Sequence, residues 1–132
     1  MFPCSEGHKA GRAICSALLL GTALLAHADK YPQYEQANLV QGRAVWLENC
    51  ETCHAYGIAG APLPDASGRW GERLAKGREA LYEHAIDGFF GPGGTMMPPR
   101  GGNDALSNDE VTAAVDYMLQ LAEDSLNNPT DR

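Results

Sequence analysis

The stretch Cys50-Glu51-Thr52-Cys53-His54 decides how the rest of this chain is interpreted. A disulfide between cysteines three positions apart would close too small a loop to staple a domain. A structural zinc site needs four ligands, and downstream of residue 28 only His84 remains beyond this cluster. A thioredoxin-like redox pair needs a βαβ context, and no strand-like runs flank the motif.

The remaining interpretation of this C-x-x-C-H pattern is the attachment of a c-type haem. Cysteines at positions i and i+3 lie on one face of a helical turn, so both thiols can reach the two vinyl groups on one porphyrin edge. His54 follows directly and is predicted to bind the iron as the proximal ligand. The motif therefore predicts one haem c, attached covalently through Cys50 and Cys53.

The N-terminal segment has the pattern of an export signal. A short basic stretch precedes an apolar run over 13–26, which ends in the small-x-small sequence Ala26-His27-Ala28. The alternative is an uncleaved membrane anchor, but the run is shorter than the roughly 20 apolar residues that span a bilayer. We predict a cleaved signal peptide over 1–28, a mature periplasmic chain that starts at Asp29, and no stable membrane insertion after cleavage.

Size and charge exclude several classes of protein. Residues 29–132 suffice for a single domain, which excludes a TIM barrel or a nucleotide-binding sheet with a second domain. The chain has 17 acidic and 10 basic side chains, a net charge of −7, and would repel a phosphate backbone. Nucleic acid is therefore not an expected partner. The carboxylates form no arrangement suited to acid–base catalysis, so the chain is not expected to be an enzyme.

Apolar spacing predicts helices over 35–52 and 78–88 and a longer helix near the C-terminus. That last helix is expected to begin with a capping box formed by Ser107 and Glu110. No alternating strand pattern stands out, and Gly- and Pro-rich loops separate the helices. The fold class is therefore predicted to be all-α, with a polar tail from about residue 123 that is expected to fray.

A second Gly- and Pro-rich loop, over 91–102, contains the adjacent residues Met96 and Met97. Methionine opposite histidine is the ligand pairing of electron-transfer cytochromes, because a thioether is a neutral, soft donor to iron. Adjacent side chains of an extended loop point in opposite directions, so only one methionine can face the iron. Pro98 restricts the residue before it to extended conformations. This favours Met97 as the second iron ligand and Met96 as loop packing.

Over residues 36–122 the sequence resembles a small bacterial class I c-type cytochrome, and most closely the cytochrome c-five branch. The residues that carry the resemblance in the two terminal helices are Gly42, Trp46, Cys50, Ala114 and Tyr117. The resemblance implies the cytochrome c fold, with three to five short helices around one haem. It also implies that the N- and C-terminal helices cross closely, which would explain a glycine inside a helix at position 42.

The same resemblance suggests further haem contacts. The stretch Gly60-Ala61-Pro62 resembles the loop whose proline orients the proximal histidine, and Trp70 and Arg73 resemble residues that meet the haem propionates. Residues 97–102 resemble the loop that carries the distal iron ligand in this family. Arg73 and Arg100 could equally be solvated charges, and both interpretations remain open at this point. The extra cysteine pair that some members of the branch carry after this loop is absent here.

The predicted function is a periplasmic electron carrier with one haem c and His54 and Met97 as axial ligands. Its redox partners are expected to present a basic docking patch to the acidic surface. One alternative is a dedicated cytochrome subunit of a periplasmic dehydrogenase or oxidoreductase complex. Another is a haem-based ligand sensor, which would need a labile sixth coordination position; the methionine loop argues against it.

Overall fold

The computed structural model describes residues 30–65 and 69–128, and those from Tyr31 onward belong to one compact unit. The predicted export signal over 1–28 lies outside the described residues. Five α-helices in the described part confirm the all-α class, and one very short hairpin accompanies them. In chain order the elements are α2 (Ala37–Asn49), α3 (Glu51–His54), η1 (Ile58–Gly60), α4 (Trp70–Leu74), α5 (Arg78–Asp87), β1 (Phe89–Phe90), η3 (Pro92–Gly94), β2 (Met96–Met97), η4 (Pro99–Gly102) and α6 (Asn108–Asn127).

The helix predicted over 35–52 consists of two parts. Helix α2 ends at Asn49, and α3 begins at Glu51 after Cys50, whose φ of −113° departs from helical geometry. The backbone N–H of Cys50 still donates to the Trp46 carbonyl, so the chain remains helix-like across the junction. The first cysteine of the motif therefore lies at a bend between two helices.

The capping box predicted at the start of α6 is confirmed. The Glu110 backbone N–H donates to Ser107 Oγ at 3.3 Å, and the Glu110 carboxylate accepts from the Ser107 backbone N–H at 2.8 Å. This reciprocal pair satisfies backbone groups that the first turn of a helix leaves without partners. It also lowers the pKa of Glu110, because the ionised carboxylate is the form that accepts these bonds.

The expectation that the chain frays from about residue 123 is wrong over 123–127, because α6 continues to Asn127. Arg78 donates to Glu123 at 3.1 Å, and the Tyr34 hydroxyl donates to Asp124. Carboxylates do not contribute to the apolar pattern from which the helix was predicted. Their hydrogen bonds nevertheless hold the end of α6 against neighbouring segments. Residues 129–132 lie outside the described part of the chain.

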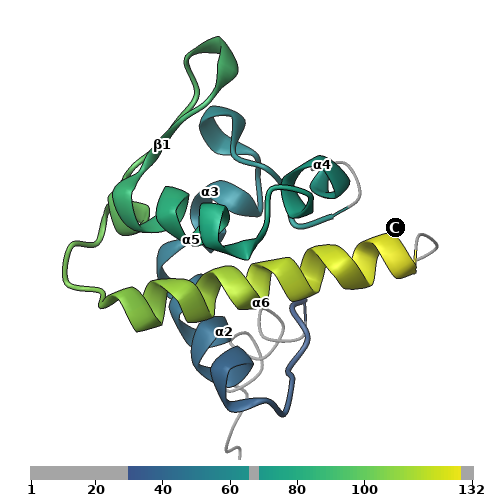
Figure 1. Ribbon diagram of the computed structural model, residues 1–132. Helices are drawn as coiled ribbons and strands as arrows, with labels where there is room; N and C mark the ends of the chain where they lie inside the picture. Colours follow the sequence, from purple (N-terminus) through teal and green to yellow (C-terminus); the bar gives the residue numbers. More distant parts are fainter. Residues whose placement is uncertain (1–29, 66–68, 129–132) are drawn as a thin grey trace, which may run out of the picture. The chain divides into compact units, whose positions relative to one another are not determined.

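Helix α6 runs across the fold, with α2 crossing it on one side and α5 packed on the other (Figure 1). At the α2–α6 crossing, a Cβ added to Gly42 would lie 2.0 Å from the Ala113 carbonyl oxygen and 3.1 Å from Tyr117 Cβ. Trp46 and Tyr117 are both fully buried beside it. The crossing that the family resemblance implied at Gly42 is thus confirmed, with the Ala113 backbone as the limiting contact.

We expect Gly42→Ala to destabilise the protein although alanine is the better helix former. Overpacking typically costs about 1–3 kcal/mol, more than the roughly 1 kcal/mol gained in helix propensity. Gly71 in α4 is a matched control, since nothing lies within 4 Å of an added Cβ there. Thermal and urea unfolding of both variants check this. Equal stability of Gly42→Ala and Gly71→Ala would contradict the close crossing.

The helix predicted over 78–88 is confirmed as α5, which ends at Asp87 before Gly88 at a φ of 86°. A short helix and a short hairpin were not predicted. Helix α4 follows the first loop, and strands β1 and β2 pair antiparallel with Phe89 opposite Met97. Two-residue strands are too short to show an alternating pattern.

Among the described residues, no helix is both long and apolar enough to cross a membrane.

Candidate haem site

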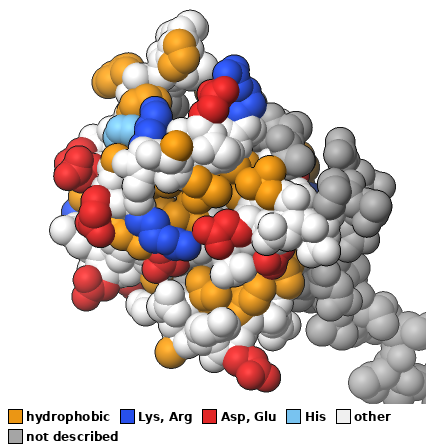
Figure 2. Space-filling view, turned by 45° about the vertical axis from the view of Figure 1, so that its right-hand side comes forward, with side chains coloured by type: hydrophobic (Ala, Val, Ile, Leu, Met, Phe, Trp, Pro, Cys, Tyr) orange, Lys and Arg blue, Asp and Glu red, His pale blue; other side chains and the backbone are white. Residues whose placement is uncertain are grey.

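The segments carrying the predicted site residues surround one cavity of about 500 Å³. Hydrophobic side chains gather in a hollow on this face of the molecule, bordered by basic and acidic side chains (Figure 2). Its lining includes Cys50, Cys53, His54, Met97 and Trp70. They come from the junction of α2 and α3, from α3, from α4 and from the distal loop, which is the segment from Met97 to the start of α6. The structure therefore brings the predicted attachment residues and both predicted ligands to a single cavity.

The His54 imidazole is buried in the cavity wall, with 7% of the residue exposed. Its Nδ1 lies 2.9 Å from the Pro62 carbonyl oxygen, which can only accept, so Nδ1 carries the proton. That tautomer leaves the Nε2 lone pair available as a metal ligand. Burial lowers the pKa of His54, which keeps the ring neutral. The loop containing Pro62 thus orients His54 through its backbone.

Both cysteines of the motif are free thiols on the cavity wall, Cys50 half-buried and Cys53 exposed. Burial raises the pKa of Cys50 to about 11, and the nearby Cys53 adds to the effect. The Cys53 and His54 backbone N–H groups both point back to the Cys50 carbonyl, at 3.3 and 3.0 Å. This single helical turn holds two thiols and an imidazole at one side of the cavity.

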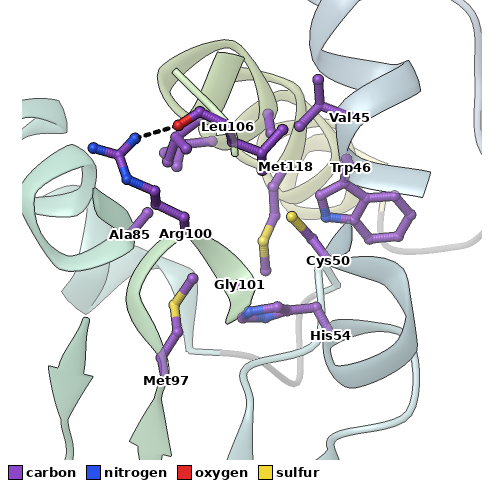
Figure 3. Close-up of a pocket in the computed structure, with 13 residues that line it drawn as sticks. Val45, Trp46, Cys50, His54, Ala85, Met97, Arg100, Gly101, Leu106 and Met118 are labelled. Carbon is purple, nitrogen blue, oxygen red and sulfur yellow. Dashed lines mark hydrogen bonds between the residues drawn. The ribbon is translucent and has the colours of Figure 1, made fainter. Parts of the chain in front are cut away.

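Met97 points into the cavity from the side opposite His54 (Figure 3). It lies on β2, where hairpin pairing keeps the backbone extended as Pro98 requires. Met96 is the neighbour on the other face of the strand and is 52% exposed, although it borders the larger cavity. Of these two adjacent methionines, Met97 alone lines the narrower inner pocket that also contains His54.

The two residues expected near the haem propionates also line the cavity. The Trp70 indole is buried, with Nε1 donating to the Leu63 carbonyl. The Arg73 guanidinium lies over the Trp70 ring, 5.8 Å from its centroid, and Nη1 is 3.4 Å from the Arg69 carbonyl oxygen. Arg73 is therefore placed against an aromatic face at the cavity wall, where it could meet a propionate.

Arg100 has partners within the protein that neither interpretation left open for it included. Its guanidinium donates to the Leu106 carbonyl at 2.7 Å and to Asn108 Oδ1 at 2.6 Å. Both acceptors belong to the segment that starts α6. Two of the five N–H donors of the guanidinium are thus engaged by the protein, which ties Arg100 to this segment instead of leaving it as a solvated charge.

Sequence analysis did not assign two of the cavity residues to the haem site. Met118 on α6 is buried and points into the inner pocket between Met97 and His54 (Figure 3). Trp46 borders the same pocket, and its buried Nε1 has no hydrogen-bond partner within the described part of the chain. The apolar spacing of the two helices is typical of core positions at both residues, but periodicity does not distinguish a core position from the wall of a cofactor site.

The donor set and the cavity fit a haem. A porphyrin needs a large apolar slot, two thiols at one edge for thioether bonds and a ligand on each face of the iron. The cavity offers this volume with two free thiols, a neutral imidazole fixed by its Nδ1 hydrogen bond and a thioether opposite. A small helical domain with this cavity and this donor set defines a cytochrome-type haem protein.

Comparisons with known proteins agree. Residues 37–118 match the family described as "Cytochrome C oxidase, cbb3-type, subunit III". Cytochrome c-555 of Chlorobaculum tepidum is 38% identical over 79% of this chain and 92% of its own length. Cytochrome c5 of Ectopseudomonas mendocina is 32% identical over 56% of this chain and 82% of its own length. A solved structure described as an electron transfer complex of nitrite reductase with cytochrome c is 37% identical, with a TM-score of 0.52, over 62% of this chain and 94% of that one.

The chain therefore belongs to the cytochrome c family, within the group that this family model describes. It is a small monohaem electron-transfer protein that binds haem c covalently, and Cys50 and Cys53 have the spacing used for that attachment. The match to a cytochrome c5 confirms the resemblance to that branch.

Proposed function

We propose that the chain is a periplasmic electron carrier, itself without enzymatic activity, whose haem iron is held by His54 and Met97. The observation that carries the proposal is their placement on two sides of one inner pocket (Figure 3). When bound, the haem supplies a one-electron couple at iron. A ligand on each side leaves no coordination position for a substrate or a gas.

The chain's own residues would perform three tasks in this role. Cys50 and Cys53 would anchor the haem edge through thioether bonds. The Pro62 carbonyl would keep His54 in the tautomer that presents Nε2 to the iron. The apolar walls would exclude water, which disfavours the more charged ferric state and raises the redox potential.

The partner we propose is a redox protein with a basic docking patch. Glu79, Glu83 and Asp87 are all exposed and recur every four residues along α5, so they form one acidic stripe. Other residues of α5, Leu81, His84 and Ala85, line the large cavity. A basic patch opposite this stripe would speed encounter and bring the partner close to the haem site.

We also propose that residues 1–28 are a cleaved export signal, and an intact mass tests this together with the haem. The full chain, expressed in a bacterial host that exports and matures c-type cytochromes, should give one periplasmic species. Its mass should correspond to Asp29–Arg132 plus one covalent haem. A mass that includes residues 1–28, or that lacks a haem, would contradict the proposal.

The dedicated-subunit alternative is favoured by the family description, which refers to an oxidase subunit. Isolating the native protein from periplasm under mild conditions separates the two roles. A free carrier should elute as a small protein that exchanges electrons with added partners. Stoichiometric recovery with a single catalytic chain would support the subunit role.

A further inference from the structure

The distal loop is fastened to α6 by one side chain. Arg100 lies in η4, three residues after Met97, and its guanidinium bridges to Leu106 and Asn108. The bond to the Leu106 carbonyl is visible in Figure 3. Hydrogen bonds from a charged donor are among the stronger ones in proteins. The two bonds together form the Arg100 fork. The fork closes residues 100–108, which follow the predicted ligand and lead into α6, into a small loop.

A second tie joins the same loop to the haem-attachment side. Asn103 Nδ2 donates to Asn49 Oδ1 at 2.8 Å, and Asn49 directly precedes Cys50. Gly101, at a φ of 65°, passes so close that an added Cβ would lie 3.1 Å from the Asn49 carbonyl oxygen. The loop thus connects the attachment side to α6, and its residues Arg100, Gly101 and Leu106 form part of the wall of the inner pocket.

The backbone at Arg100 does not favour this conformation by itself. Its φ of 52° lies in the left-handed region, which residues other than glycine rarely adopt. Such a conformation persists where surrounding contacts determine it. The two guanidinium bonds are the side-chain contacts of Arg100 that can do so.

We propose that Arg100 is a positioning residue for the sixth iron ligand: it holds the loop closed so that Met97 stays over the inner pocket. This rests on the proposed His54–Met97 ligation. Arg100 needs no contact with the haem, because it acts through the backbone of residues 98–100. Releasing its fork should raise the population of open loop, in which Met97 leaves the iron and an external ligand can replace it.

Imidazole binding to the ferric holoprotein measures that open population. Arg100→Gln should bind imidazole about tenfold more tightly than wild type, since weakening a charge-assisted hydrogen bond by about 1.4 kcal/mol changes an equilibrium constant tenfold. The weak near-infrared band of sulfur-to-ferric-iron charge transfer should also disappear at a lower temperature. Arg100→Lys retains the charge without the fork and should recover only part of the wild-type behaviour.

Arg78→Gln is the matched control. Arg78 also donates to two acceptors on α6, Asp116 at 2.9 Å and Glu123 at 3.1 Å, but lies outside the distal loop. The variant Arg78→Gln should lower thermal stability. Its imidazole affinity should stay within about twofold of wild type, because no hydrogen bond of the distal loop is lost. Asn108→Ala removes one acceptor of the fork and should give an intermediate effect, so it keeps the test decisive if Arg100→Gln folds poorly.

Three outcomes would overturn the inference. Wild-type imidazole affinity in both Arg100→Gln and Asn108→Ala would show that the fork does not hold the loop. An equal gain of affinity in Arg78→Gln would show a general loss of stability. A wild-type protein without the near-infrared band would instead remove the proposed methionine ligation, and the inference with it.

Discussion

Replacing Met97 with leucine is expected to abolish the near-infrared sulfur-to-iron band, lower the redox potential and open the reduced iron to carbon monoxide. Leucine preserves the apolar volume but has no donor atom, so one coordination position is left empty. Axial ligands set haem potentials over a range of about 0.8 V, and losing a thioether should lower the potential by on the order of 0.1 V. Absorption spectra, potentiometry and carbon monoxide titration measure the three effects.

Met96→Leu is the control for this prediction. Met96 is next to Met97 on β2 and half-exposed, so its thioether is not required at the inner pocket. All three properties should stay nearly at their wild-type values in this variant. The reverse pattern would assign the ligand to Met96 and keep the carrier role. Unchanged spectra in both variants would exclude both methionines of β2 as the ligand, and a Met118→Leu variant would then show whether the buried thioether on α6 takes that role. If that spectrum is unchanged as well, the sensor role becomes the better explanation.

The double variant Cys50→Ser, Cys53→Ser is expected to lose stable haem and, with it, most of the fold. The large cavity, about 500 Å³, would then depend on non-covalent binding alone to be filled. An unfilled apolar cavity of this size costs an amount comparable to the whole stability of a small domain, about 5–15 kcal/mol. A covalently tethered haem binds the folded state only, so its loss lowers stability by linkage.

Circular dichroism and acidic organic extraction of the haem check this prediction. The double variant should yield extractable haem and a much weaker helical signal. Cys53→Ser alone keeps the thioether at Cys50 and the buried His54, so it should retain haem and an intermediate stability. A double variant as helical and as stable as wild type would show that the fold does not depend on the cofactor.

Much of the site could be predicted because its motifs are contiguous. Two thiols and an imidazole within five residues have few chemical uses, and one helical turn brings them together without help from distant parts of the chain. The capping box at Ser107 and the end of α5 before Gly88 were predictable for the same reason. Each depends on backbone hydrogen bonds or φ angles within four residues.

The features that sequence analysis missed concern polar residues whose partners lie on other segments. The end of α6 carries Glu123 and Asp124, which suggest a solvated tail unless Arg78 and Tyr34 are known to meet them. The sequence likewise left Arg100 as either a propionate contact or a solvated charge. The structure shows a further role, in which it hydrogen-bonds Leu106 and Asn108. The charge of a side chain can be taken from the sequence, but its hydrogen-bond partner cannot, because that partner belongs to another segment of the chain.

By itself the sequence determined the class of fold, the covalent attachment at Cys50 and Cys53, the proximal role expected of His54 and the preference for Met97 over Met96. These follow from chemistry between neighbours. Only the tertiary structure decided that the Ala113 backbone requires Gly42, that α6 extends to Asn127 and that Arg100 fastens the distal loop. Those features depend on side chains and carbonyl groups that approach one another only when the helices have packed.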